Sequence, residues 1–102
     1  MGTINNIIDI IGSLKDNGFF ENGISGDFIK VYQKHYKTTS GNDSLIRYMI
    51  FDRKDNNTVI HISLYDGHRN KSKIIINDFI HPEDIENTVE SFYVFNKFIN
   101  TI

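Results

Sequence analysis

The sequence predicts an α+β fold with an N-terminal helix, an antiparallel meander of three to five strands and a long C-terminal helix, both helices packing on the sheet. Apolar residues recur at helical spacing near each end of the chain. Between them, short runs rich in β-branched and aromatic residues alternate with clusters of turn-forming residues. A chain of 102 residues is long enough for one hydrophobic core and too short for two. We therefore expect a single α+β domain spanning 1–102.

The first helix is expected over residues 3–16. Thr3 is a suitable N-cap, and Gly18 suits the left-handed position that often follows the last helical turn. One face of this helix carries the apolar residues Ile4, Ile7, Ile8, Ile11 and Leu14. The next residues are expected to form a loop or short strand that covers an edge of the core with Phe19, Phe20 and Ile24.

The segment 28–37 fits two structures. As a strand, it has one face with Ile29, Val31, Gln33 and His35, and a second face with Lys30, Tyr32, Lys34 and Tyr36. As a helix capped by Asp27, it has a buried stripe of Phe28, Val31, Tyr32 and His35. The β-branched and aromatic content favours the strand.

Three further strands are expected, over 44–53, 58–66 and 74–76. Clusters of turn-forming residues separate the strands, at 38–43, 54–57 and 66–72. In the strand expected over 58–66, one face carries Ile60, Ile62 and Leu64. The strand expected over 44–53 is apolar on both faces, which is the pattern of a central strand covered on both sides.

The last helix is expected to begin at Pro82 and to reach the end of the chain. Proline suits the first helical position, and the carboxylates that follow it favour the positive end of the helix dipole. From residue 92 onward the helix is apolar on nearly all sides, which is typical of a helix that is buried or meets another chain. The pattern is compatible with a homodimer whose contact residues are Tyr93, Val94, Phe98 and Ile102.

Charge is distributed unevenly along the chain. Residues 28–73 hold nine of the eleven lysines and arginines but four of the thirteen carboxylates. The formal net charge of −2 therefore conceals a basic centre between two acidic ends. Segments of opposite charge attract different partners, so the sequence predicts two candidate surfaces.

The first candidate surface is an acidic row at the C-terminal helix, made of Asp78, Glu83, Glu86 and Glu90. The three glutamates share one helix face. Such a row can imitate phosphates and occupy a nucleic-acid groove on another protein. It also fits an ordinary solvated helix face with carboxylates at the favourable end of the dipole.

The second candidate surface combines lysine and tyrosine. If 28–37 is a strand, one side of it carries Lys30, Tyr32, Lys34 and Tyr36, with Arg47 or Tyr48 expected nearby on the next strand. Cationic side chains bind phosphates, and tyrosine rings stack on bases. The same pattern also suits a solvated sheet face whose lysines discourage edge-to-edge pairing. A nucleic-acid-binding module is therefore an alternative function.

The sequence contains no catalytic signature. It has no cysteine, no nucleophile elbow and no glycine-rich phosphate loop. His61 and Ser63 form a His-x-Ser sequence that resembles half of the paired motif of two-histidine phosphoesterases, and the second copy is missing. A small hydrolase using His61, His68 and Asp66 is the second alternative, although the spacing matches no established metal-ligand pattern. We expect no enzymatic activity, no cofactor and no metal.

Apolar runs are far shorter than the roughly 20 residues of a membrane span, and the N-terminus lacks the basic leader of a signal peptide. We therefore expect a cytoplasmic protein that does not contact a membrane. Isoleucine, asparagine, lysine, phenylalanine and tyrosine are abundant, whereas alanine is absent. This usage indicates an AT-rich genome, that of a low-GC bacterium or its phage.

The leading hypothesis is a small non-enzymatic binding protein, encoded by a phage or mobile element, that docks on a larger host protein or nucleoprotein and inhibits it. Its small size, segregated charge and lack of a catalytic constellation support this hypothesis. Anti-CRISPR and other anti-defence proteins share this size and style, which is an analogy of type and not of family.

Overall fold

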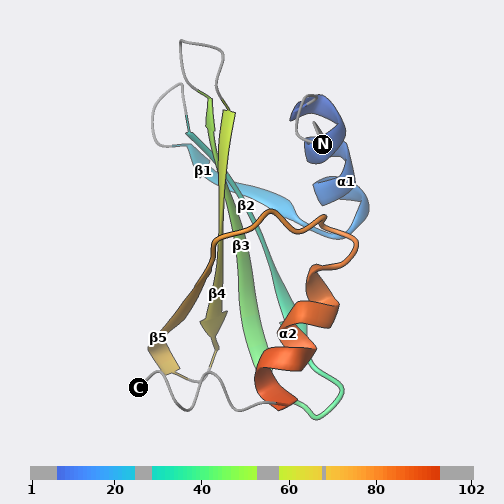
Figure 1. Ribbon diagram of the computed structural model, residues 1–102, viewed down its shortest axis with the longest axis vertical. Coiled ribbons are helices and arrows are strands. Elements are labelled where there is room, and N and C mark those ends of the chain that lie inside the picture. The colour runs from blue at the N-terminus through green and yellow to red at the C-terminus, as the bar shows by residue number, and fades with distance from the viewer. Residues whose placement is uncertain (1–6, 25–28, 53–57, 68, 95–102) are drawn as a thin grey trace.

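The structure is a computed structural model that describes residues 7–24, 29–52, 58–67 and 69–94 (Figure 1). The elements follow in the order α1 (Ile7–Asp16), β1 (Phe20–Ile24), β2 (Ile29–Lys37), β3 (Asp43–Asp52), β4 (Thr58–Asp66), β5 (Arg69–Ile76) and α2 (Ile85–Val94). The expected α+β class is confirmed, and the antiparallel meander has five strands.

The strands lie in the sheet in their sequence order, and β3 is central. Their register aligns residues in rows across the sheet, one of which contains Gln33, Arg47, Ser63 and Ile75. Because successive strand residues point to opposite faces, this register places the odd-numbered residues of β2, β3 and β4 on one face and the even-numbered residues on the other. In β5, Lys73 and Ile75 share the odd-numbered face.

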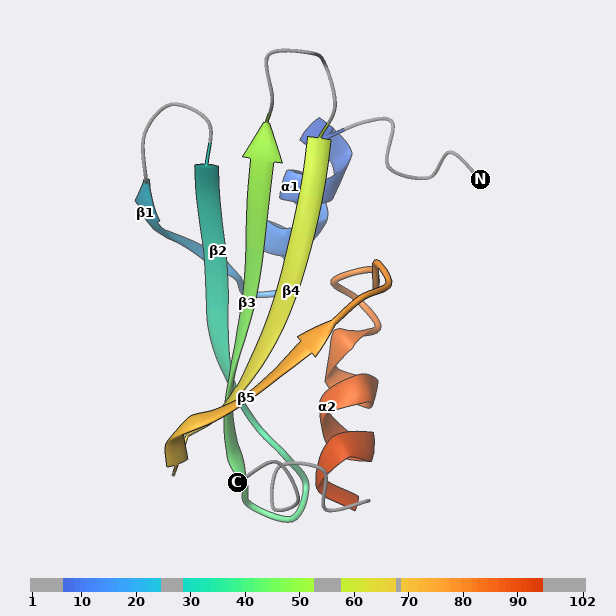
Figure 2. The same ribbon diagram turned by 60° about the vertical axis from the view of Figure 1, so that its left-hand side comes forward.

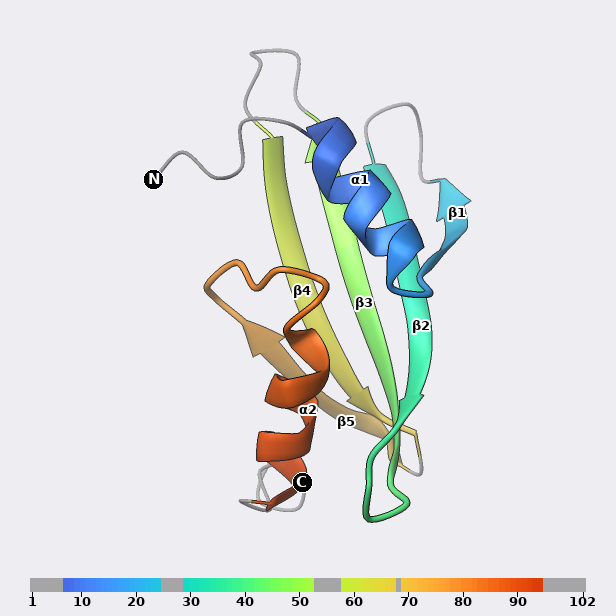
Figure 3. The same ribbon diagram turned by 90° about the vertical axis from the view of Figure 1, so that its right-hand side faces the viewer.

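Both helices lie against the same face of the sheet, one beyond the other along the strands (Figures 1 and 3). We call this side the helix face; it is formed by the even-numbered residues. The opposite side, formed by the odd-numbered residues, is covered by no described segment, and we call it the open face. The sheet twists strongly, so that β5 crosses the direction of β3 (Figure 2).

The hydrophobic core lies between the helix face and the two helices. It comprises Ile10, Leu14, Phe19, Tyr32, Ile46, Tyr48, Ile50, Ile62, Leu64, Ile85 and Val89. Every strand residue in this set is even-numbered, so the described core is one-sided. The expectation that β3 is covered on both sides is therefore wrong for the described part, since the apolar side chains on its open face stay partly exposed.

The end of α1 is as expected. Gly18 has a φ of 86°, its N–H donates to Lys15 O at 3.2 Å, and the N–H of Phe19 donates to Leu14 O at 2.9 Å. These two bonds form a Schellman motif, and the buried side chains of Leu14 and Phe19 supply its usual apolar contact. The motif turns the chain directly from α1 into β1.

Residues 29–37 of the segment 28–37 form a strand, and the helix alternative is wrong for them. They pair with β3 along their whole length, and β1 pairs on the other side. Two sheet neighbours satisfy the backbone groups that a helix would have paired internally. The expected turn at 66–72 is also shorter, because β5 already begins at Arg69.

The C-terminal helix differs most from expectation. Residues 82–84 form a turn, in which the N–H of Asp84 donates to His81 O at 2.8 Å, and α2 begins only at Ile85. Pro82 is fully buried in that turn. The described helix is short, with ten residues, and the expected long helix is wrong in that respect. Residues 3–6 and 95–102 of the two expected helices lie outside the described residues.

Candidate functional site

The predicted row of lysine and tyrosine lies on the helix face, where most of its side chains are buried or partly buried. Tyr32 and Lys34 are buried, with exposed fractions of 2% and 8%, whereas Lys30 is exposed. Arg47 is aligned with Gln33 and therefore lies on the open face. The structure does not bring these residues together on one surface, because Arg47 lies on the opposite face of the sheet. Tyr48, the other expected neighbour, pairs with Tyr32 on the helix face and is buried there.

Lys34 connects both helices to the sheet. Its Nζ donates to Glu86 Oε2 on α2 at 2.6 Å and to Asn17 O beyond α1 at 2.7 Å. The same ammonium lies 4.9 Å from the centroid of the Phe19 ring. A buried charge needs this kind of compensation to be tolerated. Lys34 therefore has a structural role in the described chain.

Glu90 makes a second connection between α2 and the sheet. Tyr36 Oη donates to Glu90 Oε2 at 2.5 Å, and the N–H of Thr39 donates to the same oxygen at 3.0 Å. Asp78 and Glu83 are exposed, whereas Glu86 and Glu90 turn toward the sheet. The predicted acidic row is therefore divided between two solvent-facing carboxylates and two that hold α2 in place.

These contacts shift two pKa values. The hydrogen bond from Tyr36 lowers the pKa of Glu90, burial opposes it, and the bonds from Thr39 reinforce it. The same Tyr36–Glu90 bond, helped by burial, raises the pKa of Tyr36 to about 12. The contact is therefore strongest with the carboxylate ionised and the phenol protonated.

Replacing Glu90 with glutamine is expected to weaken the acid dependence of stability. A carboxyl group whose pKa is lower in the folded chain adds stability above its unfolded value of 4.5, and this stability is lost as the pH falls through the folded-state pKa. Urea unfolding from about pH 6 to about pH 3 should therefore show a steeper loss for wild type than for Glu90→Gln.

The matched control for this prediction is Glu83→Gln, on an exposed side chain with no described hydrogen bond to the sheet. It should retain the steeper wild-type dependence. Equal slopes for wild type and Glu90→Gln would show that the Tyr36 contact does not form in solution.

The predicted self-association residues do not form one exposed surface in the described part. Tyr93 Oη donates to Asp43 O at 2.8 Å and lies 3.5 Å from Asp66 Oδ1. Burial, followed by the charge of Asp66, raises the pKa of Tyr93 to about 12. Val94 is 71% exposed, and Phe98 and Ile102 lie outside the described residues. The homodimer stays a prediction.

The histidine cluster of the hydrolase hypothesis is not assembled by its described members. His61 is exposed on the open face, whereas Asp66 is buried on the helix face, so the two side chains of β4 point in opposite directions. His68 lies outside the described residues. Within the described ranges, no group of three or more histidine or acidic side chains could hold a metal ion.

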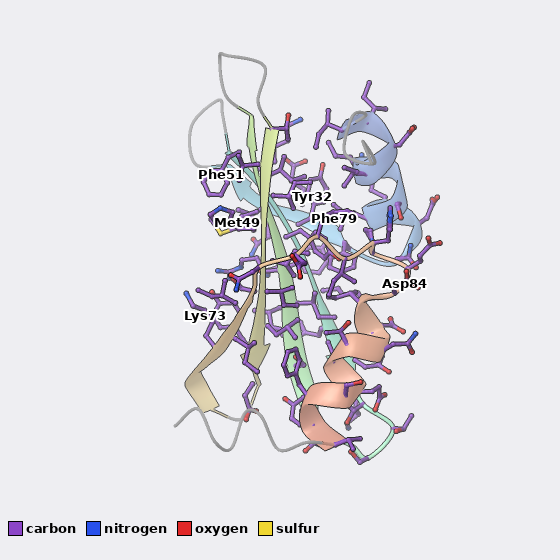
Figure 4. The ribbon with its side chains drawn as sticks, viewed as in Figure 1. Tyr32, Met49, Phe51, Lys73, Phe79 and Asp84 are labelled. Atoms are coloured by element: carbon purple, nitrogen blue, oxygen red, sulfur yellow. The ribbon has the colours of Figure 1, made fainter. Side chains whose placement is uncertain are left out.

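The open face carries apolar and aromatic side chains at the end where β3 finishes. These side chains are partly exposed and come from three strands: Val31, Met49, Phe51 and Val59. The exposed ring of His61 lies beside Phe51, with ring centroids 4.9 Å apart. Figure 4 shows Met49 and Phe51 on the side of the sheet away from the helices. An apolar sheet surface of this kind is typical of a contact site.

Arg47 lies at the centre of the open face, held by neutral groups. Its Nε and Nη2 donate to Gln33 Oε1 at 3.3 and 3.2 Å, and its Nη1 donates to Tyr65 Oη at 3.4 Å. The guanidinium carbon lies 5.1 Å from the centroid of the Tyr65 ring, and Lys73 Nζ approaches the same ring at 5.8 Å. No described ion pair neutralises Arg47.

The charge asymmetry of the sequence becomes an asymmetry between the two faces. On the open face, the described charges of β2–β5 are those of Lys37, Arg47, Lys73 and Asp43. The helix side carries Asp9, Asp16 and the acidic residues around α2. The open face is therefore cationic and aromatic, and the helix side is acidic.

The sequence indicated Arg47 as a candidate but not the surface around it. The signal was present in the odd-numbered apolar residues of β3 and in the aromatic residues His61 and Tyr65 of β4. Only the register shows that these side chains share a face with Arg47.

No described helix is long and apolar enough to cross a membrane. In comparisons with known proteins, no family model, curated protein or solved structure matches this chain.

Proposed function

We propose that this is a small non-enzymatic binding protein that docks on a larger macromolecule through its open face and inhibits it. The partner is a host protein or nucleoprotein in the cytoplasm of a bacterial cell, and the protein is encoded by a phage or mobile element. One observation carries the proposal: partly exposed apolar and aromatic side chains occupy the sheet face that lies away from both helices (Figure 1) and that no described segment covers.

The size of the open face supports docking. Strands of five to ten residues, spaced by about 4.8 Å, give a five-stranded face with a flat area of roughly 600–700 Å². A stable protein interface buries about 800 Å² on each partner. The open face with its rim is therefore large enough to hold a partner. The acidic row is a weaker candidate, because Glu86 and Glu90 already bind within the chain.

The test is capture of the partner from a low-GC bacterial lysate by tagged wild type and by Met49→Glu. Met49 is partly exposed among the apolar side chains of the open face, on the central strand, so a carboxylate there should abolish capture of the partner that wild type retains in stoichiometric amount. Met49→Glu should remain folded by circular dichroism, because Met49 lies outside the buried core.

The control is Val94→Glu, which places the same charge on an exposed residue of α2. Capture by Val94→Glu at the wild-type level would assign binding to the open face. Equal capture by all three proteins would refute the proposed surface. Sedimentation of Val94→Glu also tests the homodimer, which the substitution should dissociate if α2 forms its contact.

A further inference from the structure

We infer that the open face binds single-stranded nucleic acid, with Arg47 and Lys73 contacting phosphates and the rings of Phe51 and His61 stacking on bases. The inference rests on the proposed function, because it names the partner of the same face. It also moves the nucleic-acid interface from the helix face, where the sequence predicted it, to the opposite side of the sheet.

The first support is that the Arg47 guanidinium is held by hydrogen bonds to neutral side chains. Gln33 and Tyr65 fix its plane through three of the five N–H donors that an arginine carries. Both partners are neutral, so the positive charge is positioned without being neutralised by a described carboxylate. One N–H on Nη1 and one on Nη2 remain to donate to a phosphate.

The second support is the order of groups along β3 and β4. The Phe51–His61 ring pair lies at one end, the row of Arg47 and Ser63 follows, and Tyr65 lies beyond it. From His61 to Tyr65 the strand advances by about 13 Å, which separates two aromatic positions by a cationic one. Sheets that bind single-stranded RNA stack two or three bases on such rings.

The third support is charge. The described open face of β2–β5 carries three cations and one carboxylate, Asp43, which lies opposite Lys37 at one end of the sheet. The centre of the face therefore attracts polyanions, whereas the acidic helix side repels them and orients the approach. A duplex would keep its bases stacked internally, so a single strand suits the aromatic rings better.

A second copy of this chain fits the same face less well. In a symmetric face-to-face dimer with its axis near the sheet centre, the Arg47 side chains of the two copies would meet. Like charges brought together without a counter-ion oppose association. The charge that attracts a nucleic acid therefore disfavours self-association through this face.

The experiment is fluorescence anisotropy of labelled oligothymidylate and oligouridylate of about 12 nucleotides, titrated at several salt concentrations. Two phosphate contacts should give a slope of log K against log salt near −1.4, since each contributes about −0.7 on a single strand. Arg47→Ala should weaken binding by about tenfold. Lys73→Ala should make the slope shallower by about 0.7, and it should leave the core unchanged because Lys73 is exposed.

The matched control is Lys30→Ala, which removes an exposed lysine from the same sheet but from the helix face. It should bind like wild type. His61→Ala should weaken binding several-fold while leaving the salt slope unchanged, because stacking releases no counter-ions. Circular dichroism checks that each variant is folded.

The outcomes separate this inference from the proposed function. Lack of oligonucleotide binding at low salt, or equal losses in Lys30→Ala and Lys73→Ala, would overturn the inference. If a nuclease-resistant protein partner is then still lost in Met49→Glu, the proposed function stands with a protein as partner. If Met49→Glu instead converts a dimer to a monomer, the occupant is a second copy and the inference is wrong.

Discussion

Tyr48→Ala is expected to destabilise the protein by about 3–5 kcal/mol, the range for truncating a large buried aromatic side chain. Tyr48 is completely buried at the centre of β3. Its ring makes edge contacts with Phe19 and Phe79, with centroids 5.2 and 6.4 Å away. Its Oη donates to Ile80 O at 2.5 Å. One side chain thus joins the end of α1, the central strand and the segment that leads into α2.

The measurement is the free energy of unfolding from urea or thermal denaturation. Small domains are stable by about 5–15 kcal/mol, so Tyr48→Ala should lower the midpoint sharply or leave the chain unfolded. Tyr48→Phe keeps the ring and removes only the hydrogen bond to Ile80, with an expected cost of about 1–2 kcal/mol.

Tyr65→Ala is the matched control for Tyr48, because it truncates a tyrosine of the neighbouring strand on the open face. Tyr65 is partly exposed and lies outside the core cluster, so the cost should stay near 1 kcal/mol. Similar losses at the two tyrosines would contradict a one-sided core. They would show that the open face is covered in solution as heavily as the helix face.

Local signals in the sequence predicted much of the fold. Gly18 ends α1 as expected, because the left-handed conformation there depends on the residue itself. The two-residue alternation of 58–66 placed Ile62 and Leu64 on one face of β4, and both are buried there. The strand character of 29–37 followed from its β-branched and aromatic residues. Each prediction needed only neighbouring residues.

Predicting the candidate surfaces requires knowing which residues come into contact in the folded chain, and these residues lie far apart in the sequence. Glu86 and Glu90 were assigned to one surface and Lys34 and Tyr36 to another, yet these groups bind each other across 52 and 54 residues of sequence. Composition shows that charges are segregated, but only tertiary packing shows which of them pair. The apolar residues on both faces of β3 likewise do not show which of the two faces is covered by the helices. Local sequence rules are expected to fail at surfaces reserved for a partner.

The Lys34–Glu86 pair gives the second large effect, and the two single substitutions should be unequal. The Lys34 side chain is 10% exposed, whereas that of Glu86 is 45% exposed. Removing the carboxylate with Glu86→Ala leaves a buried ammonium without its counter-charge, at an expected cost of about 2 kcal/mol. Lys34→Met removes the buried charge and keeps an apolar stem of similar length. The remaining carboxylate can hydrate, so the expected cost is below about 1 kcal/mol.

The double substitution Lys34→Met with Glu86→Ala decides whether charge is the cause. If the cost of Glu86→Ala comes from the stranded ammonium, removing that ammonium should recover most of it, and the double variant should be nearly as stable as Lys34→Met alone. Additive losses would mean that each side chain stabilises the fold through separate contacts, such as that of Lys34 with Asn17 O. The open face should be unaffected in every variant, because both residues lie on the helix side of the sheet. Oligonucleotide binding measured on the same samples therefore separates the stability of the scaffold from the activity of its surface.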